Sequence, residues 1–367
     1  MTLLDDRPTA PPAPTVAPRT GRWAAVATGP IQRTALRWLL VAAGTVGIFA
    51  AFLVAKGADP IAVLESMWET SAASTDSIGE TCLRATPILL AALAAAVPAR
   101  AGLFNLGGEG QLLLGSVGAF LVANQINGSP TWLTLLLMAL GGAVLGGLWA
   151  ALPAVLKVVT RTNEAISGLL LNYIAALIVT WLCFEPWKDP VSLGQAYSRE
   201  LEGSERFSVI WGNRVHWGIF IALAAAVVLW LVLRFTTWGF KLRVLGGNPQ
   251  AARRAGLAVG GLSIAAMVVG GAMAGLGGMI EVAGTEGRLR PDLLAGVGFI
   301  GFLASWLARH DPLKIVLSSL LLGAIAVGGS GLKITAGLSG GAVNILMALV
   351  LFGVLGWGAK PAADGRS

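Results

Sequence analysis

Long apolar runs recur along the whole chain and constrain its fold more than any other feature. The runs are continuously apolar, without the alternation of polar and apolar residues that a membrane β-barrel requires. Of the 367 residues, 55% are hydrophobic and 12% are charged, whereas a soluble domain carries about 25% charged residues. The sequence therefore predicts an all-α, polytopic membrane protein whose spans are apolar helices.

Ten segments are candidate membrane spans, because each holds an apolar stretch suited to crossing a bilayer. They start near Leu36, Thr86, Gly110, Thr131, Asn163, Trp217, Leu262, Asp292, Leu313 and Leu338. The second segment is short and the third follows a polar, glycine-rich stretch, so their common boundary is the least determined. Eight spans are the alternative, if two of the segments only dip into the membrane.

The distribution of charge predicts the orientation. When the N-terminus is placed inside and the spans alternate, most of the 26 Lys and Arg fall inside and most acidic residues fall outside. This bias follows the positive-inside rule and predicts that both termini are cytoplasmic. Residues 1–34 are rich in Pro, Ala and Thr without the apolar core of a signal peptide, so we expect a disordered cytoplasmic tail. Residues 35–358 then form the transmembrane domain, and residues 359–367 form a second cytoplasmic tail.

Two long connections lie outside the predicted spans. The outer loop covers residues 185–216 and is mixed in charge, whereas the inner loop covers residues 234–261 and is basic. Within the inner loop, Asn248 suits a helix cap and Pro249 suits the first helical turn. We therefore expect a short helix in the inner loop.

The two halves of the chain are predicted to run in opposite directions across the membrane. Spans two to five begin by running inward, and spans seven to ten begin by running outward, as in transporters built from inverted repeats. The polar, glycine-rich stretch of the first half, residues 102–111, has a rough counterpart in "GGMIEVAGTEG", Gly277–Gly287. The pattern predicts about ten helices in two inverted halves.

The sequence holds no motif for catalysis. There is no Walker A motif, so we expect no ATP hydrolysis by this chain and no enzymatic activity of its own. The two histidines, His216 and His310, are far apart and predicted on opposite faces, which argues against a histidine-based metal site. A membrane-bound transferase is not supported, because no aspartate-rich metal–diphosphate motif is present. We predict neither catalytic nor metal-binding residues.

Polar residues inside or beside spans are the remaining candidates, since an ionisable side chain in a membrane costs roughly 2.5–3.5 kcal/mol on insertion scales. They are Asn105, Glu109, Gln111, Asn163, Glu164, Asn172, Tyr173, Glu281 and Asn344. For Asn163 and Glu164 we favour a helix cap, and for Asn344 a hydrogen bond between helices. Glu281 has two interpretations, a functional carboxylate or a solvated residue near the outer end of its span.

Residues 102–111 differ from the other candidates, because Asn105, Glu109 and Gln111 occur close together among four glycines. A break in a span exposes backbone polar groups, which is tolerated only against protein or a water-filled cavity. We therefore predict a broken helix that lines a substrate path, with a purely structural kink as the alternative. Amide side chains suit a sugar hydroxyl or a nucleobase edge, and Phe104 offers a stacking face. For Glu109 we favour pinning of the broken helix, and for Phe104 and Asn105 contact with the path.

Three segments together resemble one known family. They are "GLFNLGGEGQLLLG", "TNEAISGLLLNYIA" and "GFKLRVLGGNPQAARRAGL", which start at Gly102, Thr162 and Gly239. In this order and spacing they are similar to the permease subunits of bacterial ABC importers for nucleosides and simple sugars. Those subunits belong to a broader permease family that includes ribose and branched-chain amino-acid systems. The resemblance runs from about residue 80 to residue 358.

The resemblance implies a multi-pass protein of the bacterial cytoplasmic membrane that imports nucleosides. Besides membrane lipid it implies three partners: a second homologous permease, an ATPase with two nucleotide-binding halves, and a substrate-binding lipoprotein. Nucleic acid is not expected, and ATP and magnesium would bind to the partner ATPase, with no cofactor in this chain. The predicted substrate-pathway residues are Phe104, Asn105, Glu109, Gln111, Asn172, Tyr173 and Glu281. The predicted ATPase-coupling residues are Gly247, Asn248, Ala251, Ala252, Arg253, Arg254 and Gly256.

Two positions depart from the family pattern. In the segment Gly296–Leu313, Ile300 stands where nucleoside permeases usually carry an acid, which leaves the substrate open between a nucleoside and a simple sugar. Arg254 stands where the family usually has Tyr, in the loop expected to dock on the ATPase, and is compatible with docking. An ion-coupled secondary transporter is the alternative from another class, with Glu109 or Glu281 as the proton carrier.

Overall fold

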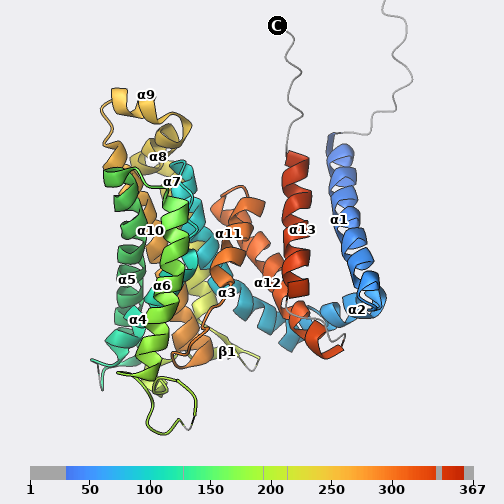
Figure 1. Ribbon diagram of the computed structural model, residues 1–367, viewed down its shortest axis with the longest axis horizontal. Helices are drawn as coiled ribbons and strands as arrows, with labels where there is room; N and C mark the ends of the chain where they lie inside the picture. The colour runs from blue at the N-terminus through green and yellow to red at the C-terminus, as the bar shows by residue number, and fades with distance from the viewer. Residues whose placement is uncertain (1–29, 127, 193, 213, 336–340, 359–367) are drawn as a thin grey trace, which may run out of the picture.

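The computed structural model describes residues 30–126, 128–192, 194–212, 214–335 and 341–358, and every structural statement below concerns these residues. They form a bundle of helices with one small two-stranded hairpin at one end (Figure 1). The predicted helical class is therefore confirmed. Most of the predicted N-terminal tail and the whole predicted C-terminal tail lie outside the described residues.

The elements follow one another as labelled in Figure 1. The first half of the chain holds α1 (Pro30–Ala55), α2 (Pro60–Ser71), α3 (Thr75–Arg100), α4 (Gly108–Ala123), α5 (Thr131–Thr160) and α6 (Glu164–Phe184). The outer connection holds η1 (Gly203–Glu205), β1 (Val209–Trp211) and β2 (Val215–His216). The second half holds α7 (Gly218–Phe235), α8 (Thr237–Gly247), α9 (Pro249–Arg254), α10 (Val259–Ile280), η2 (Glu281–Glu286), α11 (Val297–Leu307), α12 (Pro312–Thr335) and α13 (Gly341–Gly358).

Six helical segments are long and apolar enough to cross a membrane, namely α3, α5, α6, α7, α10 with η2, and most of α12. α1 and α2 add a seventh span if the pair, which is bent by 116°, is counted as one broken span. α4, α11 and part of α13 are shorter apolar helices. A multi-pass helical architecture is thus present, whereas the count of ten spans and the N-in, C-in orientation stay predictions.

The second predicted span is wrong in its start and its length. The sequence predicts a short span from Thr86, but α3 has 26 residues and starts at Thr75. Ser74 caps the helix, because its hydroxyl accepts a hydrogen bond from a first-turn N–H at 3.1 Å. Charged residues between Asp76 and Arg84 interrupt the apolar run and hide this start in the sequence. The longer helix therefore includes Arg84, which lies before the predicted span.

α10 lies at the centre of the bundle and packs against α3, α4 and α5. Glycines bring the helix backbones together in this region. A Cβ on Gly275 of α10 would collide with the backbone of Gly142 on α5, and a Cβ on Gly115 of α4 would collide with Gly275. Small residues allow such close approach between membrane helices, where packing replaces the hydrophobic effect as the main attraction. The core is therefore a glycine-mediated contact of three helices.

The order of elements repeats in the two halves of the chain. In the first half a long helix, α3, is followed by irregular residues 101–107 and the short α4; in the second, α10 with η2 is followed by irregular residues 287–296 and the short α11. The counterpart of residues 101–107 is therefore residues 287–296. The match to Gly277–Gly287 suggested by the sequence is wrong, because nearly all of those residues continue as helix through α10 and η2.

Candidate functional site

The irregular residues 101–107 separate the end of α3 from the start of α4. α3 ends where the carbonyl of Pro98 accepts a hydrogen bond from the Leu103 N–H at 3.0 Å. Gly102 follows with a φ of +74°, a conformation that glycine adopts without strain. Helical structure resumes at Gly108. The break that the sequence predicts is therefore present.

A reciprocal pair of amides holds the break together. Asn105 Nδ2 donates to Gln111 Oε1 at 2.9 Å, and Gln111 Nε2 donates to Asn105 Oδ1 at 2.8 Å. Asn105 Nδ2 also donates to the Ala94 carbonyl at 3.1 Å. In a regular helix that carbonyl would bond to the residue four positions later, but this residue is Pro98, which has no N–H. The two side chains are 3% and 1% exposed, so in this conformation they support the backbone and are not open to a ligand.

α6 holds the same break from another side. Asn172 Nδ2 donates to the Leu106 carbonyl at 2.9 Å, and Asn172 Oδ1 accepts from the Gly110 N–H at 2.8 Å. Gly168 of α6 also lies against Gly107, so close that a Cβ on either residue would meet the other backbone. One buried amide thus bridges the last irregular residues and the first turn of α4.

Asn163 and Glu164 have different roles at the start of α6. Asn163 Oδ1 accepts a hydrogen bond from the Ala165 N–H at 2.9 Å, which confirms the predicted cap. Glu164 is buried, pairs with Lys157 at 2.6 Å and accepts from the Phe104 N–H at 3.3 Å. Its carboxylate is therefore a link between α5, α6 and the break, and the capping interpretation is wrong for Glu164.

The N-termini of α4 and α11 meet beside Glu109. Glu109 lies in the first turn of α4, and a Cβ on Gly298 of α11 would collide with its backbone. The Glu109 carboxylate accepts a hydrogen bond from the backbone of Gly296, while its Oε2 is buried without a hydrogen-bond partner among the described residues. A carboxylate is stabilised where helix N-termini converge. Glu109 therefore joins the breaks of the two halves.

Phe104 is the aromatic residue of the break and is 49% exposed. Its ring stacks on Trp306 of α11, with centroids 6.0 Å apart and 5° between the ring planes. These rings line a cavity of about 180 Å³ together with Phe302 and His310. Burial lowers the pKa of His310 to about 4, and the positive charge of Arg100 lowers it further. His310 is therefore neutral near pH 7, and the wall opposite Phe104 is aromatic and uncharged.

Tyr173 and Glu281 lie apart from the break. Tyr173 is exposed on α6, on one face with Leu170 and Leu177. Glu281 is buried at the start of η2, so its interpretation as a solvated residue is wrong. Among the described residues, neither side chain forms a hydrogen bond with the residues of the break. The structure thus gathers five of the seven predicted pathway residues and leaves these two outside.

Sequence reasoning missed two further candidates, Arg84 and Trp306. Arg84 is exposed on α3 and lines a cavity of about 610 Å³. A signal for it exists in the sequence, since Ser74 and Asp76 are typical of a helix start and would have placed Arg84 inside the span. For Trp306 no such signal exists, because its partner Phe104 is far away along the chain.

α8 and α9 form a helix pair at the end of the bundle opposite the hairpin (Figure 1). Asn248 Oδ1 accepts two backbone N–H groups of α9 at 3.0 Å each, and Pro249 stands in the first turn. The predicted short, capped helix is therefore present. Ala252 is buried under it, whereas Arg253 and Arg254 are exposed. The exposed members of the predicted coupling set are Gly247, Asn248, Ala251, Arg253, Arg254 and Gly256.

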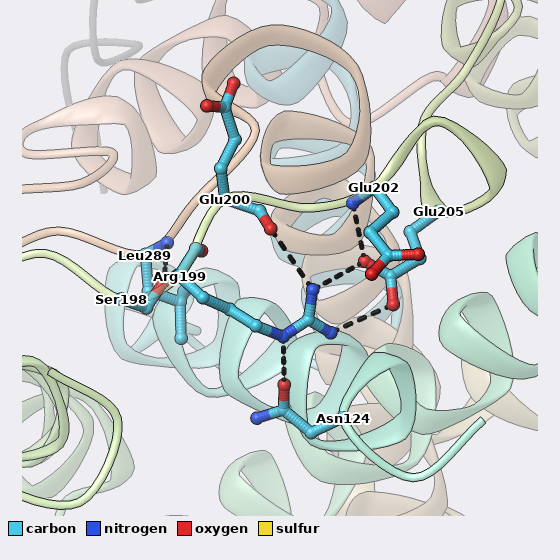
Figure 2. A network of polar contacts seen from close by, with 7 residues as sticks. All are labelled: Asn124, Ser198, Arg199, Glu200, Glu202, Glu205 and Leu289. Carbon is cyan, nitrogen blue, oxygen red and sulfur yellow. Dashed lines mark hydrogen bonds and ion pairs between the residues drawn. The ribbon is translucent and has the colours of Figure 1, made fainter. Parts of the chain in front are cut away.

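Arg199 organises the outer connection (Figure 2). Its guanidinium donates to both oxygens of the buried Glu205 at 2.8 and 2.9 Å, and to Asn124 Oδ1 at 2.7 Å. The hydrogen bonds to Glu205 raise the pKa of Arg199. Ser198 and Leu289 exchange two further hydrogen bonds, at 2.8 and 3.1 Å. The outer connection is thus fixed to the end of α4 and to the residues after η2.

The fold and the site together define a class of membrane transport protein, with helices broken inside the bundle and a capped, basic helix pair exposed at one end. Residues 77–355 match the family described as "Branched-chain amino acid transport system / permease component". The chain belongs to this permease family, which confirms the resemblance seen in the three sequence segments.

Individual relatives cover most of both chains. The chain is 33% identical to the glucose ABC transporter permease protein of Haloferax volcanii, over 87% of this chain and 88% of that one. It is 32% identical to a guanosine ABC transporter permease protein of Bacillus subtilis, over 85% and 88%. It is 28% identical to a nucleoside ABC transporter permease protein of Lactococcus lactis, over 83% and 85%.

Proposed function

We propose that this chain is the transmembrane permease subunit of an ATP-driven ABC importer that translocates nucleosides across a bacterial cytoplasmic membrane. The observation that carries the proposal is the similarity, over most of both chains, to permeases named for guanosine and for nucleosides. The relative named for glucose supports a simple sugar as the second candidate. The chain itself supplies the path, and a partner subunit hydrolyses ATP.

The break between α3 and α4 supports a role in translocation. Asn105, Gln111 and Asn172 use their amides to hold the irregular backbone, so we assign them the positioning of the break. Phe104 and Trp306 stack on each other beside a cavity, which gives this part of the break an aromatic wall. Broken helices of this kind form the binding sites of many transporters.

The helix pair α8–α9 supports coupling to the ATPase. Arg253 and Arg254 are exposed on a helix whose start is capped and whose underside is anchored by the buried Ala252. Guanidinium groups form bidentate contacts with carboxylates, so this surface suits acidic groups on the ATPase. In the proposed complex, ATP and magnesium bind to that ATPase. A second homologous permease and a substrate-binding lipoprotein complete the complex.

The coupling role is tested by charge reversal at Arg253. The change Arg253→Glu places like charges across the proposed contact, so we expect less ATPase to co-purify with the permease and less substrate-stimulated ATP hydrolysis. Lys314→Glu is the matched control, because Lys314 is an exposed basic residue of α12 outside the helix pair. Equal co-purification and equal ATP hydrolysis in both variants would count against this surface.

A further inference from the structure

A second cavity, larger than the one beside Phe104, lies between α3, α11, α12 and α13. Its volume is about 610 Å³, within the range of about 300–1,000 Å³ that is typical of small-molecule sites. The residues that the argument uses are Arg84, Gly296, Phe299, Ile300, Ser330 and Asn344. They come from four helices and from the irregular segment before α11, so any relative movement of these elements changes the cavity.

The polar groups of the cavity are available to a ligand. Arg84 and Asn344 are exposed, and neither side chain forms a hydrogen bond or a salt bridge within the described part of the chain. The Ser330 hydroxyl donates to the Val327 carbonyl at 2.6 Å, which leaves its oxygen free to accept. An arginine within a membrane helix is costly and points to a functional role by default. Arg84 is thus a donor without an assigned acceptor.

The remaining wall of the cavity is apolar and in part aromatic. Phe299 of α11 is 42% exposed and lines the cavity, with Ile300 beside it. Gly296, which precedes the first turn of α11, also lines it, and its backbone N–H already donates to the Glu109 carboxylate. An aromatic ring, a guanidinium and an amide together suit a flat ligand whose edge carries hydrogen-bond acceptors.

We propose that this cavity binds the base of the transported ligand, with Arg84 as its principal polar contact and Phe299 as its stacking surface. The proposal rests on the function proposed above and names the chemistry that the path recognises. The guanidinium fork pairs with two adjacent acceptors, such as the O6 and N7 atoms of a 6-oxopurine. Asn344, which offers both a donor and an acceptor, pairs with a further polar group of the ligand.

Arg84 has one competing role, as the counter-ion of a buried acid. The charged residues around Glu281 are Arg84, Arg290 and Glu286. No ion pair within 4.0 Å joins Arg84 to Glu281, whereas Arg290 pairs with Glu286 at 2.7 Å. If Arg84 served only to balance the charge of Glu281, removing both charges together would restore the guanosine turnover that is lost when Arg84 alone is replaced. The double variant Arg84→Gln/Glu281→Gln therefore separates the two roles.

The test uses the complete transporter, with both permeases, the ATPase and saturating loaded binding protein, in proteoliposomes. Turnover is measured for guanosine and for 7-deazaguanosine, which lacks the N7 acceptor, in wild type, Arg84→Gln and Arg84→Lys. Lys56→Gln is the matched control, because it removes an exposed positive charge from the end of α1, away from this cavity. The binding protein is the same throughout, so a changed ratio of the two turnovers originates in the permease.

We expect Arg84→Gln to lower guanosine turnover about tenfold, a loss of one bidentate contact, and to remove the preference over 7-deazaguanosine. Arg84→Lys keeps the charge but not the fork and gives an intermediate value. An unchanged ratio in Arg84→Gln overturns the proposal, as does recovery in the double variant with Glu281→Gln. If Arg84→Gln does not assemble, Asn344→Leu is tested for the same loss of turnover. If the wild-type transporter takes up glucose but not guanosine, the proposed nucleoside function itself is refuted.

Discussion

The paired amides of Asn105 and Gln111 give the sharpest prediction about the break. Asn105→Leu removes three side-chain hydrogen bonds, two to Gln111 and one to the Ala94 carbonyl. Side-chain hydrogen bonds in membrane proteins average about 0.6 kcal/mol, so three of them give about 2 kcal/mol. This agrees with the range of about 1–3 kcal/mol for leaving buried polar groups unpaired. Gln111→Met removes only the two bonds to Asn105 and should lower the free energy of unfolding by about 1 kcal/mol.

The double variant Asn105→Leu/Gln111→Met distinguishes a mutual pair from two independent contacts. It loses the same three bonds as Asn105→Leu but leaves only the Ala94 carbonyl unpaired, so we expect a loss of about 2 kcal/mol instead of the additive sum of about 3 kcal/mol. The assay is unfolding in mixed micelles by titration with a denaturing detergent. Additive losses, with an interaction energy below about 0.5 kcal/mol, would refute the reasoning.

Three further predictions concern packing, the outer connection and pH. Gly275→Ala should destabilise the bundle by about 3 kcal/mol, because its Cβ meets the backbone of Gly142. Gly44→Ala, in the interior of α1 with open space around its Cβ, should not lower the melting temperature, since alanine favours a helix more than glycine does. Equal melting temperatures of the two variants would contradict the packing. Arg199→Gln leaves the carboxylate of the buried Glu205 without its ion-pair partner and should speed proteolysis of the outer connection. An unchanged cleavage rate would count against the network in Figure 2. Burial and the charge of Arg206 lower the pKa of His216 to about 4. Between about pH 6.5 and pH 4 the unfolded chain binds a proton at this residue that the folded chain does not bind, so up to about 3 kcal/mol of stability is lost as the pH falls through this range. His216→Asn should flatten this dependence of stability on pH.

The sequence predicted those features that arise from local patterns. Apolar runs place the long helices, and the caps at Asn163 and Asn248 follow from side chains that bond to the adjacent backbone. The break was predictable because glycines and amides cluster within a few residues. These signals need no knowledge of tertiary structure.

Features that depend on the folded arrangement of the backbone were not predictable from the sequence. From the sequence alone, Asn105 is interpreted as a ligand contact. In the structure it donates to the Ala94 carbonyl, which has no helical donor because the residue four positions later is Pro98. The sequence predicts the start of α3 too late, because its charged first turns interrupt the apolar run, and Arg84 therefore falls before the predicted span. Glycine content indicates Gly277–Gly287 as the counterpart of the break, whereas the order of elements in the structure makes residues 287–296, before α11, the counterpart.

The central claim is that the chain forms a nucleoside path driven by a separate ATPase. The most direct test is guanosine uptake into proteoliposomes that contain the chain with or without the second permease, the ATPase and the binding protein. We predict uptake only when all components and ATP are present, with no effect of a proton ionophore. Guanosine uptake by the chain alone, abolished by the ionophore, would contradict the account and identify an ion-coupled carrier.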